Sequence, residues 1–430
     1  MSSGGMLVQG DRMEKLNRSV AEHCELTRRY FFQLGSVAAA AWSASPLAAA
    51  NPLSDPRLRE AAAKLEYLTP LARARIIDKG KTEILKLPPE RLREIGLVPE
   101  TWSLDVIPDP ASDSIVEQPL SLALGNALNW NGLMKLADRH AVRFMHLCVC
   151  TNGNDPFHMS LWEGVPLREV IWLARPKANI RRVYYQSYHP ANIPPFQASL
   201  PLGYVLETPP GQTPVVLAYK MNGQVIPASH GGPVRVVMPG TYGNKSIKWV
   251  RRILLTNDYK ANDSDAELNS DVESSLKTRA RFINAPKETP AATPAALTGM
   301  AQVGVSGLAK VQYCVHSQKN PWPVNDPPWD SAEWKDATIL PPPADWGGGL
   351  PGGKLPASTN QIDSKTGKPL QWPMRYTIVH WAALLPGLPA GNYDLCCRTI
   401  DLNGIAQPMP RPLLRTGVTA IQRLTLLVKA

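Results

Sequence analysis

The sequence predicts an α+β protein of more than one domain, with a β-rich C-terminal part. Its 430 residues exceed the length that a single hydrophobic core usually serves. The composition is globular, and 42 prolines favour loops and strands over helical bundles. From Trp102 onward, short apolar runs alternate with Pro, Gly and Asn turns and with helical segments, which is the pattern of mixed α and β structure.

Residues 51–100 predict a helical lead-in. Asp55 and Pro56 begin a stretch of good helix formers, and a second segment has Pro88 and Pro89 before its first turn and Gly96 after its last. The following domain, residues 101–285, has expected strands at Phe144–Val149, Arg182–Tyr185, Val215–Tyr219 and Val234–Met238, and expected helices at Leu133–Asp138 and Leu167–Leu173.

Residues 286–430 predict a β-sandwich. A polar stretch from Asn257 to about Thr298, with prolines near its end, is the best candidate for a linker. Beyond it, turn signals separate short strand-like runs, as in a sandwich. The runs are Val303–Val305, Ala309–Val315, Tyr376–Val379, Tyr393–Ile400 and Leu424–Val428, and residues 316–375 are expected to form long surface loops rich in Pro, Trp and Gly.

The first 50 residues predict a twin-arginine export signal. Arg28 and Arg29 precede a moderately apolar, Ala-rich run that ends in small residues at Ala48–Ala50. A membrane anchor helix is the alternative, but Gly, Ser, Gln and Pro make the run weakly hydrophobic. No later segment approaches about 20 continuous apolar residues, so we expect a periplasmic protein without stable membrane insertion after processing.

The net charge of +10 favours small anions as ligands. The basic residues are spread along the chain without a block of consecutive Lys and Arg, so we expect no nucleic-acid partner. Of the six cysteines, Cys24 falls in the expected signal, and no C-x-x-C pair indicates a zinc site or a covalent haem. Five remaining cysteines leave at least one free thiol in an oxidising compartment, and a free thiol can bind a metal.

The most informative segment is the glycine-rich block from His230 to Trp249. A strand, Arg235–Met238, leads through Pro239 and Gly240 into a loop with Ser and Lys side chains. Backbone amides beside glycines, together with Arg and Lys, suit a phosphate or a pterin-like anion. Seen alone, such a segment is more often a solvated basic loop between two strands.

Together with Leu217–Gly223 upstream, this block resembles the molybdopterin-binding segment of the sulfite oxidase family. The resemblance implies a sulfite-oxidase-type mixed α+β domain that holds molybdenum and molybdopterin. Further on, Gly304–Gly307, Gly391–Leu395 and Arg398–Asp401 resemble the immunoglobulin-like dimerisation domain of molybdenum sulfite oxidases. That second resemblance implies a homodimer.

In this family a single cysteine thiolate binds molybdenum, at a strand end before a glycine–asparagine turn. Cys150 occupies that place here, at the end of the apolar run, and a soft thiolate suits such a centre. Cys148 lies on the same face by the period-2 alternation of a strand, so position alone does not exclude it. Either cysteine would otherwise be a small buried apolar residue.

The resemblance assigns the cofactor to a set of residues in and near the block: His230, Arg235, Ser246, Ile247 and Lys248, with His189 as a further contact. It makes Tyr259, in Asp258-Tyr259-Lys260, the candidate for a catalytic polar group beside the metal, although an exposed loop tyrosine is an equal alternative. A structural turn histidine is the alternative for His230.

The chain departs from the family pattern after Cys150. Thr151 and Asn152 intervene before the glycine–asparagine pair, and Asp155-Pro156 stand where the family often has Arg. A missing Arg removes positive charge from the place where an oxyanion would bind. Candidate replacements are Arg143, Arg168 and Lys260.

Three functions are compatible with these residues. The first is oxidation of sulfite or a related small oxyanion by oxygen-atom transfer, with electrons passing to a separate carrier such as a c-type cytochrome. The second is reduction of S- or N-oxides, such as methionine sulfoxide, at the same site. The third is an exported sandwich-containing binding protein without the cofactor, which the retained Cys150, Arg235 and Lys248 disfavour.

Overall fold

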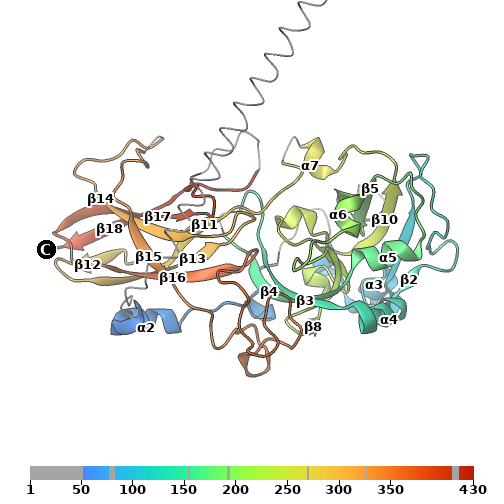
Figure 1. Ribbon diagram of the computed structural model, residues 1–430, viewed down its shortest axis with the longest axis horizontal. Coiled ribbons are helices and arrows are strands. Elements are labelled where there is room, and N and C mark those ends of the chain that lie inside the picture. The colour runs from blue at the N-terminus through green and yellow to red at the C-terminus, as the bar shows by residue number, and fades with distance from the viewer. Residues whose placement is uncertain are drawn as a thin grey trace, which may run out of the picture. The chain divides into compact units, whose positions relative to one another are not determined.

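The structure, a computed structural model, describes residues 52–76, 83–153, 155–190, 194–268, 271–325, 327–408 and 416–430. Within it, Asp55–Ala430 form one compact unit (Figure 1). The expected export signal lies outside the described residues. None of the helices in the described ranges has the length and apolar character needed to cross a lipid bilayer.

The helical lead-in is present as α2 (Pro56–Ala63) and α3 (Pro89–Glu94) with short 3-10 helices between and after them. The side chain of Asp55 caps α2 by accepting a hydrogen bond from the Arg57 amide at 2.9 Å. The α2 helix packs against strands β13 (Ala295–Gln302) and β16 (Ile378–Leu385) of the C-terminal sheet, as Figure 1 shows for β16.

The first sheet has the order β2–β1–β10–β5–β6. Its strands are β1 (Ser103–Pro108), β2 (Leu128–Asn129), β5 (Arg182–Ser187), β6 (Gln197–Pro201) and β10 (Val250–Thr256). β1 pairs with β10 in parallel, and the other pairs are antiparallel. Its core includes residues of α4 (Trp130–His140), α5 (Leu167–Leu173) and α6 (Leu202–Leu206), and the predictions of α4 and α5 are confirmed.

The second sheet has the order β3–β4–β7–β8, and β9 also pairs with β7. Its strands are β3 (Val142–Cys148), β4 (His158–Pro166), β7 (Val216–Met221), β8 (Gln224–Val225) and β9 (Arg235–Val237). Along β3 the side chains alternate as a strand requires. Met145, Leu147 and Val149 enter one hydrophobic core, whereas Phe144 enters another. Cys148 and Cys150 therefore share the face opposite to Leu147.

The C-terminal sheet has the order β11–β13–β16–β15–β14–β17–β18–β12. Besides β13 and β16, its strands are β11 (Arg279–Asn284), β12 (Glu288–Pro290), β14 (Lys310–Ser317), β15 (Lys335–Ile339), β17 (Gly391–Ile400) and β18 (Gln422–Lys429). Strands from both ends of this order contribute to one core that contains Leu297, Trp381, Leu395 and Leu426, and β11 contacts β17. The sheet thus folds back over its own apolar face.

The stretch that predicts a linker instead contains α7 (Ser264–Glu267), β11 and β12. Within this polar stretch, side chains alternate over a short run. Ala280 and Phe282 face the core, and they alternate along the strand with Arg279 and Arg281. β11 therefore joins the C-terminal sheet on the N-terminal side of the boundary expected at residue 286, and the boundary itself stays a prediction.

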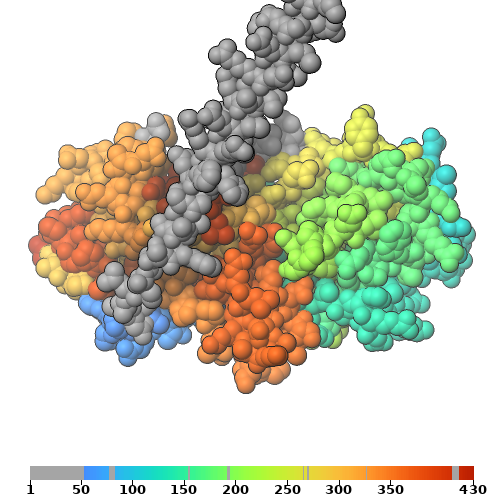
Figure 2. Space-filling model, in the orientation of Figure 1, coloured from blue at the N-terminus to red at the C-terminus, as the bar shows by residue number. Residues whose placement is uncertain are grey.

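The region expected to be loops, residues 316–375, contains one further element of the C-terminal sheet, β15. The connection from β15 to β16 reaches the second sheet, because the Asn360 amide donates to the Arg143 carbonyl at 2.7 Å. At its end, the Leu147 amide donates to the Tyr376 carbonyl at 2.8 Å. Figure 2 shows much of this connection, in orange, on the surface of the molecule.

Candidate cofactor site

A cavity that is partly open to solvent lies where β3 ends beside the glycine-rich block. Segments distant in sequence line it: Arg75, Cys148, Cys150, Phe157, His158, Ser187, Tyr188, His189, Pro194, Phe196, His230, Arg235, Gly243, Asn244, Ser246, Ile247, Lys248 and Trp249. Among these described lining residues there is no Asp or Glu, whereas Arg75, Arg235 and Lys248 are cationic. The cavity is therefore suited to an anion.

Both candidate thiols reach the cavity. Cys148 ends β3, and Cys150 follows on the same face, with its Sγ 2.8 Å from Oδ1 of Asn152. The glycine-rich loop comes close to this strand end, because the Gly243 amide donates to the Val149 carbonyl at 2.8 Å. A Cβ at Gly243 would stand 3.3 Å from that carbonyl oxygen, so a side chain would crowd the approach.

Arg235, on β9, connects the two turns that border the cavity. Its guanidinium donates from Nη1 to the His230 carbonyl at 2.8 Å and from Nη2 to the Ser246 carbonyl at 2.9 Å. The side chain is only 3% exposed, and it lies over the Trp162 ring at 5.2 Å from the ring centroid. Both terminal nitrogens of Arg235, a residue predicted to bind the cofactor, therefore already hold the cavity wall.

The third nitrogen of the Arg235 guanidinium, Nε, is buried and has no hydrogen-bond partner in the structure. A buried N–H without a partner is costly, typically by about 1–3 kcal/mol. An anionic group placed in the cavity would offer it an acceptor. Together with a soft thiol at Cys150, this donor set fits an anionic pterin cofactor that carries a thiophilic metal.

Two histidines beside Arg235 are held in the neutral form. Burial lowers the pKa of His158 well below its usual value, and the nearby Arg235 charge adds to the effect. Burial also lowers the pKa of His230. The two rings lie 6.3 Å apart, and His158 Nδ1 lies 2.8 Å from Ser160 Oγ. Neutral imidazoles can donate and accept hydrogen bonds at a polar ligand without adding charge.

The remaining predicted cofactor contacts also line the cavity: Ser246, Ile247, Lys248 and His189. Ser246 Oγ accepts from the Met238 amide at 3.1 Å, which fixes the loop against the strand that precedes it. Lys248 Nζ donates to the Ser229 carbonyl at 3.2 Å, and His189 Nδ1 lies 3.0 Å from the Pro190 carbonyl. The structure thus brings together seven of the eight predicted site residues, counting Cys150, His230 and Arg235 with these four.

The eighth predicted residue, Tyr259, is not at the cavity. Its side chain is 76% exposed, and Tyr259 is absent from the lining residues. Its backbone carbonyl accepts from Arg182 Nε at 3.2 Å, which holds the loop against β5 while the ring remains in solvent. The structure therefore gives Tyr259 the exposed-loop position that the sequence left open as the alternative.

The replacement cations expected from the sequence are used elsewhere. Arg143 pairs with Glu163 at 2.6 Å, Arg168 pairs with Glu169 at 3.1 Å, and neither lines the cavity, nor does Lys260. Besides Arg235 and Lys248, the described cation that lines the cavity is Arg75, which the sequence did not reveal. Its amide donates to the Phe157 carbonyl at 3.1 Å, and its guanidinium lies over the Phe157 ring at 5.6 Å.

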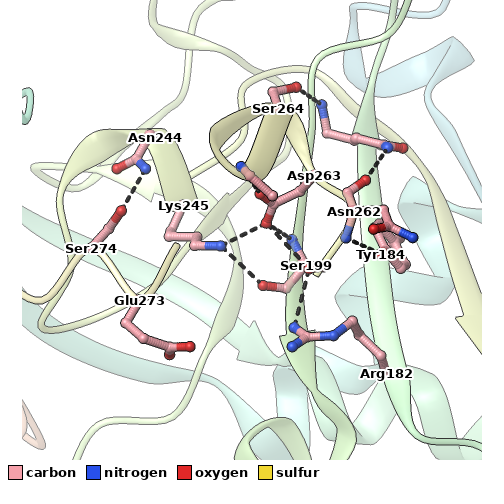
Figure 3. Close-up of polar contacts among 12 residues, drawn as sticks. Arg182, Tyr184, Ser199, Asn244, Lys245, Asn262, Asp263, Ser264, Glu273 and Ser274 are labelled. Atoms are coloured by element: carbon pink, nitrogen blue, oxygen red, sulfur yellow. Dashed lines mark hydrogen bonds and ion pairs between the residues drawn. The ribbon is translucent and has the colours of Figure 1, made fainter. Parts of the chain in front are cut away.

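Behind the cavity wall, a buried ion pair fixes the glycine-rich loop. Lys245 Nζ lies 2.7 Å from Asp263 Oδ2, with side-chain exposures of 1% and 0% (Figure 3). Ser199 on β6 completes the cluster, since its carbonyl accepts from Lys245 at 3.2 Å and its amide donates to Asp263 at 3.1 Å. Lys245 belongs to the same turn as Gly243, Asn244 and Ser246, so the pair ties the cavity wall to the first sheet.

We predict that Lys245→Met lowers the free energy of unfolding by about 3–5 kcal/mol, because it leaves Asp263 charged, buried and without its cation. Denaturant titration of the purified protein measures this change. Lys260→Met is the matched control, since Lys260 is exposed and close in sequence to Asp263. Equal stability of the two variants would contradict a role for the ion pair.

Residues 94–263 match the family described as the oxidoreductase molybdopterin binding domain. Among curated proteins, a nitrate reductase [NADPH] of Fusarium oxysporum is 34% identical over 99 residues, which are 23% of this chain and 11% of that protein. The sulfite oxidase of Gallus gallus is 45% identical over 64 residues, which are 15% of this chain and 13% of that protein. The matches thus span little more than a tenth of these relatives' length.

Among solved structures, the sulfane dehydrogenase SoxCD from Paracoccus pantotrophus aligns over 90% of this chain and 95% of its own, with a TM-score of 0.53 and 19% identity. At that identity the likeness shows the fold. The resemblance that the glycine-rich block indicated is thereby confirmed, and with it the cofactor. Residues 94–263 are an oxidoreductase molybdopterin binding domain, so the chain is a molybdenum oxidoreductase similar to the sulfite oxidases, and the cofactor of this domain is molybdenum with molybdopterin.

Proposed function

We propose that this protein oxidises sulfite or a related small oxyanion and passes the electrons to a separate carrier such as a c-type cytochrome. Sulfite and water would give sulfate, two protons and two electrons. The observation that carries the proposal is the cavity itself, which gathers two thiols, three cations and no described carboxylate around the family's cofactor segment. When bound, the cofactor supplies the oxygen-atom transfer and the redox change.

The protein's own residues would hold the cofactor and orient the substrate. Cys150 would be the thiolate ligand, and Arg235 Nε, His158 and His230 would meet the polar face of the pterin. Lys248 would place a point charge near its phosphate. Since Arg235 is braced by the His230 and Ser246 carbonyls, its N–H is oriented before the cofactor arrives, which lowers the cost of ordering it.

Arg75 would bind the substrate anion. Arg235 and Lys248 are each bonded to backbone carbonyls, whereas the Arg75 guanidinium lies against the Phe157 ring at the cavity. A sulfite dianion near neutral pH needs a paired charge to leave water. With one cation in place of the family's fuller set, we expect weak sulfite binding that decreases as salt concentration rises.

A second function is favoured by a different observation. Phe157, Tyr188, Phe196 and Trp249 give the cavity aromatic walls, which suit an uncharged organic group better than a small dianion. The same centre would then reduce an S- or N-oxide, such as methionine sulfoxide. Turnover with each substrate class distinguishes the two directions.

We further propose that the C-terminal sheet is an immunoglobulin-like sandwich through which the protein forms a homodimer. Its support is the resemblance in Gly391–Leu395 and Arg398–Asp401 and the single core shared by both ends of the sheet. Sedimentation at the mass of one chain would exclude the dimer.

Purified protein should oxidise sulfite with ferricyanide or a c-type cytochrome as acceptor, and Arg75→Ala should raise KM about 10- to 100-fold, since a hydrogen bond to a charged group contributes about 1.5–3 kcal/mol. Arg73→Ala is the matched control, because Arg73 pairs with Glu66 on the surface. Steady-state kinetics at two salt concentrations measure both effects. Reduction of methionine sulfoxide without sulfite oxidation would replace the first function by the second.

Cys150→Ser should abolish turnover while the protein remains folded and retains pterin, because a hydroxyl is a poor ligand for a soft centre. Molybdenum X-ray absorption should show one sulfur neighbour fewer than in the unmodified enzyme. Cys148→Ser is the control from the same face of β3 and should retain that sulfur. If the two variants exchange these results, Cys148 is the ligand.

The export proposal rests on Arg28 and Arg29, which precede the apolar run of residues 1–50. Replacing both by Lys should keep the protein in the cytoplasm of a host with twin-arginine export. Cell fractionation followed by immunoblotting measures the distribution. A protein that reaches the periplasm equally well without the two arginines would remove the proposal.

A further inference from the structure

Two cysteines far from the cavity lie opposite each other in the C-terminal sheet. Strands β14 and β17 are antiparallel, and their register pairs Cys314 with Cys396. In the same register, the Gln318 amide donates to the Asn392 carbonyl at 2.9 Å. Hydrogen-bonded pairs recur at every second residue, so Cys314 and Cys396 also form such a pair, with Cα atoms about 5.5 Å apart. Disulfides span Cα separations of about 4.4–6.8 Å.

The neighbouring thiol, Cys397, points the other way. It belongs to the hydrophobic core of the C-terminal sheet, with Val311 and Leu426, whereas Cys314 and Cys396 do not. Successive side chains of a strand alternate between faces. A bond between Cys396 and Cys397 would have to cross the strand, so Cys314 is the partner that the sheet offers to Cys396.

A tryptophan-rich segment between β14 and β15 packs on the sheet face that carries the pair. His316 stacks on Trp322 at 3.9 Å, and Arg398 lies 4.2 Å from the centroid of the Trp334 ring. His316 lies two residues after Cys314, and Arg398 lies two residues after Cys396, so both share the sheet face of the two cysteines. Cys314 and Cys396 are accordingly only 2% and 0% exposed. The tryptophans that pack on His316 and Arg398, on either side of the pair, are called the tryptophan cover below.

Shielding controls the reactivity of the pair. Burial, together with the charge of Glu333, raises the pKa of the Cys314 thiol to about 11, and burial raises the pKa of the Cys396 thiol to about 12. The thiolate is the attacking species in thiol–disulfide exchange, so the reduced pair reacts slowly while the tryptophan cover is closed. The thiols in the structure are free.

We propose that Cys314 and Cys396 are a modification site, at which an intramolecular disulfide forms by exchange with a small-molecule or protein disulfide. The thiolate of one cysteine attacks the donor disulfide and releases one donor thiolate. The second cysteine thiolate then attacks the mixed disulfide and releases the other. Two cysteine S–H bonds are lost, one S–S bond forms, and the donor is reduced to two thiols that take up the two protons.

After the full-length protein is incubated with glutathione disulfide and the excess reagent is removed, its mass should be 2 Da lower. Proteolysis under non-reducing conditions should yield one linked peptide pair that contains Cys314 and Cys396. The linked form should also melt higher, by on the order of 5 °C, because the bond restricts the unfolded chain. Trp334→Ala should accelerate the reaction several-fold by loosening the tryptophan cover.

Cys397→Ser is the matched control and should leave the linkage unchanged, whereas Cys314→Ser and Cys396→Ser should each abolish it. Two results would overturn the proposal. One is a linked peptide that joins Cys396 to Cys397, or either to Cys148 or Cys150. The other is full alkylation of Cys314 and Cys396 after oxidation of the Trp334→Ala protein, whose thiols are the more accessible.

Discussion

The geometry of the cofactor site depends on the position of one side chain, that of Arg235. Its two terminal nitrogens hold the His230 and Ser246 carbonyls, which belong to the two turns on either side of the cavity. A buried guanidinium keeps its charge only where carbonyls or anions solvate it, and burial already lowers the pKa of Arg235. The two turns solvate this cation in part, and a cofactor that accepts from Nε would complete its solvation, as we propose, and so couple cofactor binding to the shape of the cavity.

The contacts behind the cavity wall explain why the glycine-rich turn can be rigid. Asp263 and Lys245 anchor the glycine-rich turn from behind, while the Gly243 amide attaches it to the end of β3. A wall fixed on both sides loses little freedom when a ligand binds. The connection between β15 and β16 supports the outer edge of β3, where the Leu147 amide donates to the Tyr376 carbonyl, so this connection also contributes to the position of the thiols.

The parts of the site that the sequence predicted are those that belong to local motifs. Alternation along β3 placed Cys148 and Cys150 on one face, and the glycine-rich block supplied His230, Arg235 and Lys248. Arg75 and Phe196 come from distant segments, and no local pattern marks them as neighbours of the cavity. Tyr259 was chosen by its place in a motif, but burial decides whether a tyrosine reaches a site, and the loop leaves it exposed.

The same limit applies to the fold. The helices α4 and α5 and most strands have a clear period, whereas β11 has Ala280 and Phe282 as its inward residues within a polar stretch, a signal too short to distinguish from a linker. The hydrogen bonds of Arg235 to the His230 and Ser246 carbonyls could not be predicted either. A sequence shows that an Arg is present, but not which acceptors surround it.

The most direct test of this account is anomalous diffraction at the molybdenum absorption edge from crystals of the purified protein. The account predicts a single strong peak in the cavity, adjacent to Cys150 Sγ, with pterin density that reaches Arg235 Nε. A peak elsewhere in the molecule, or pterin density that leaves Arg235 Nε without an acceptor, would contradict it.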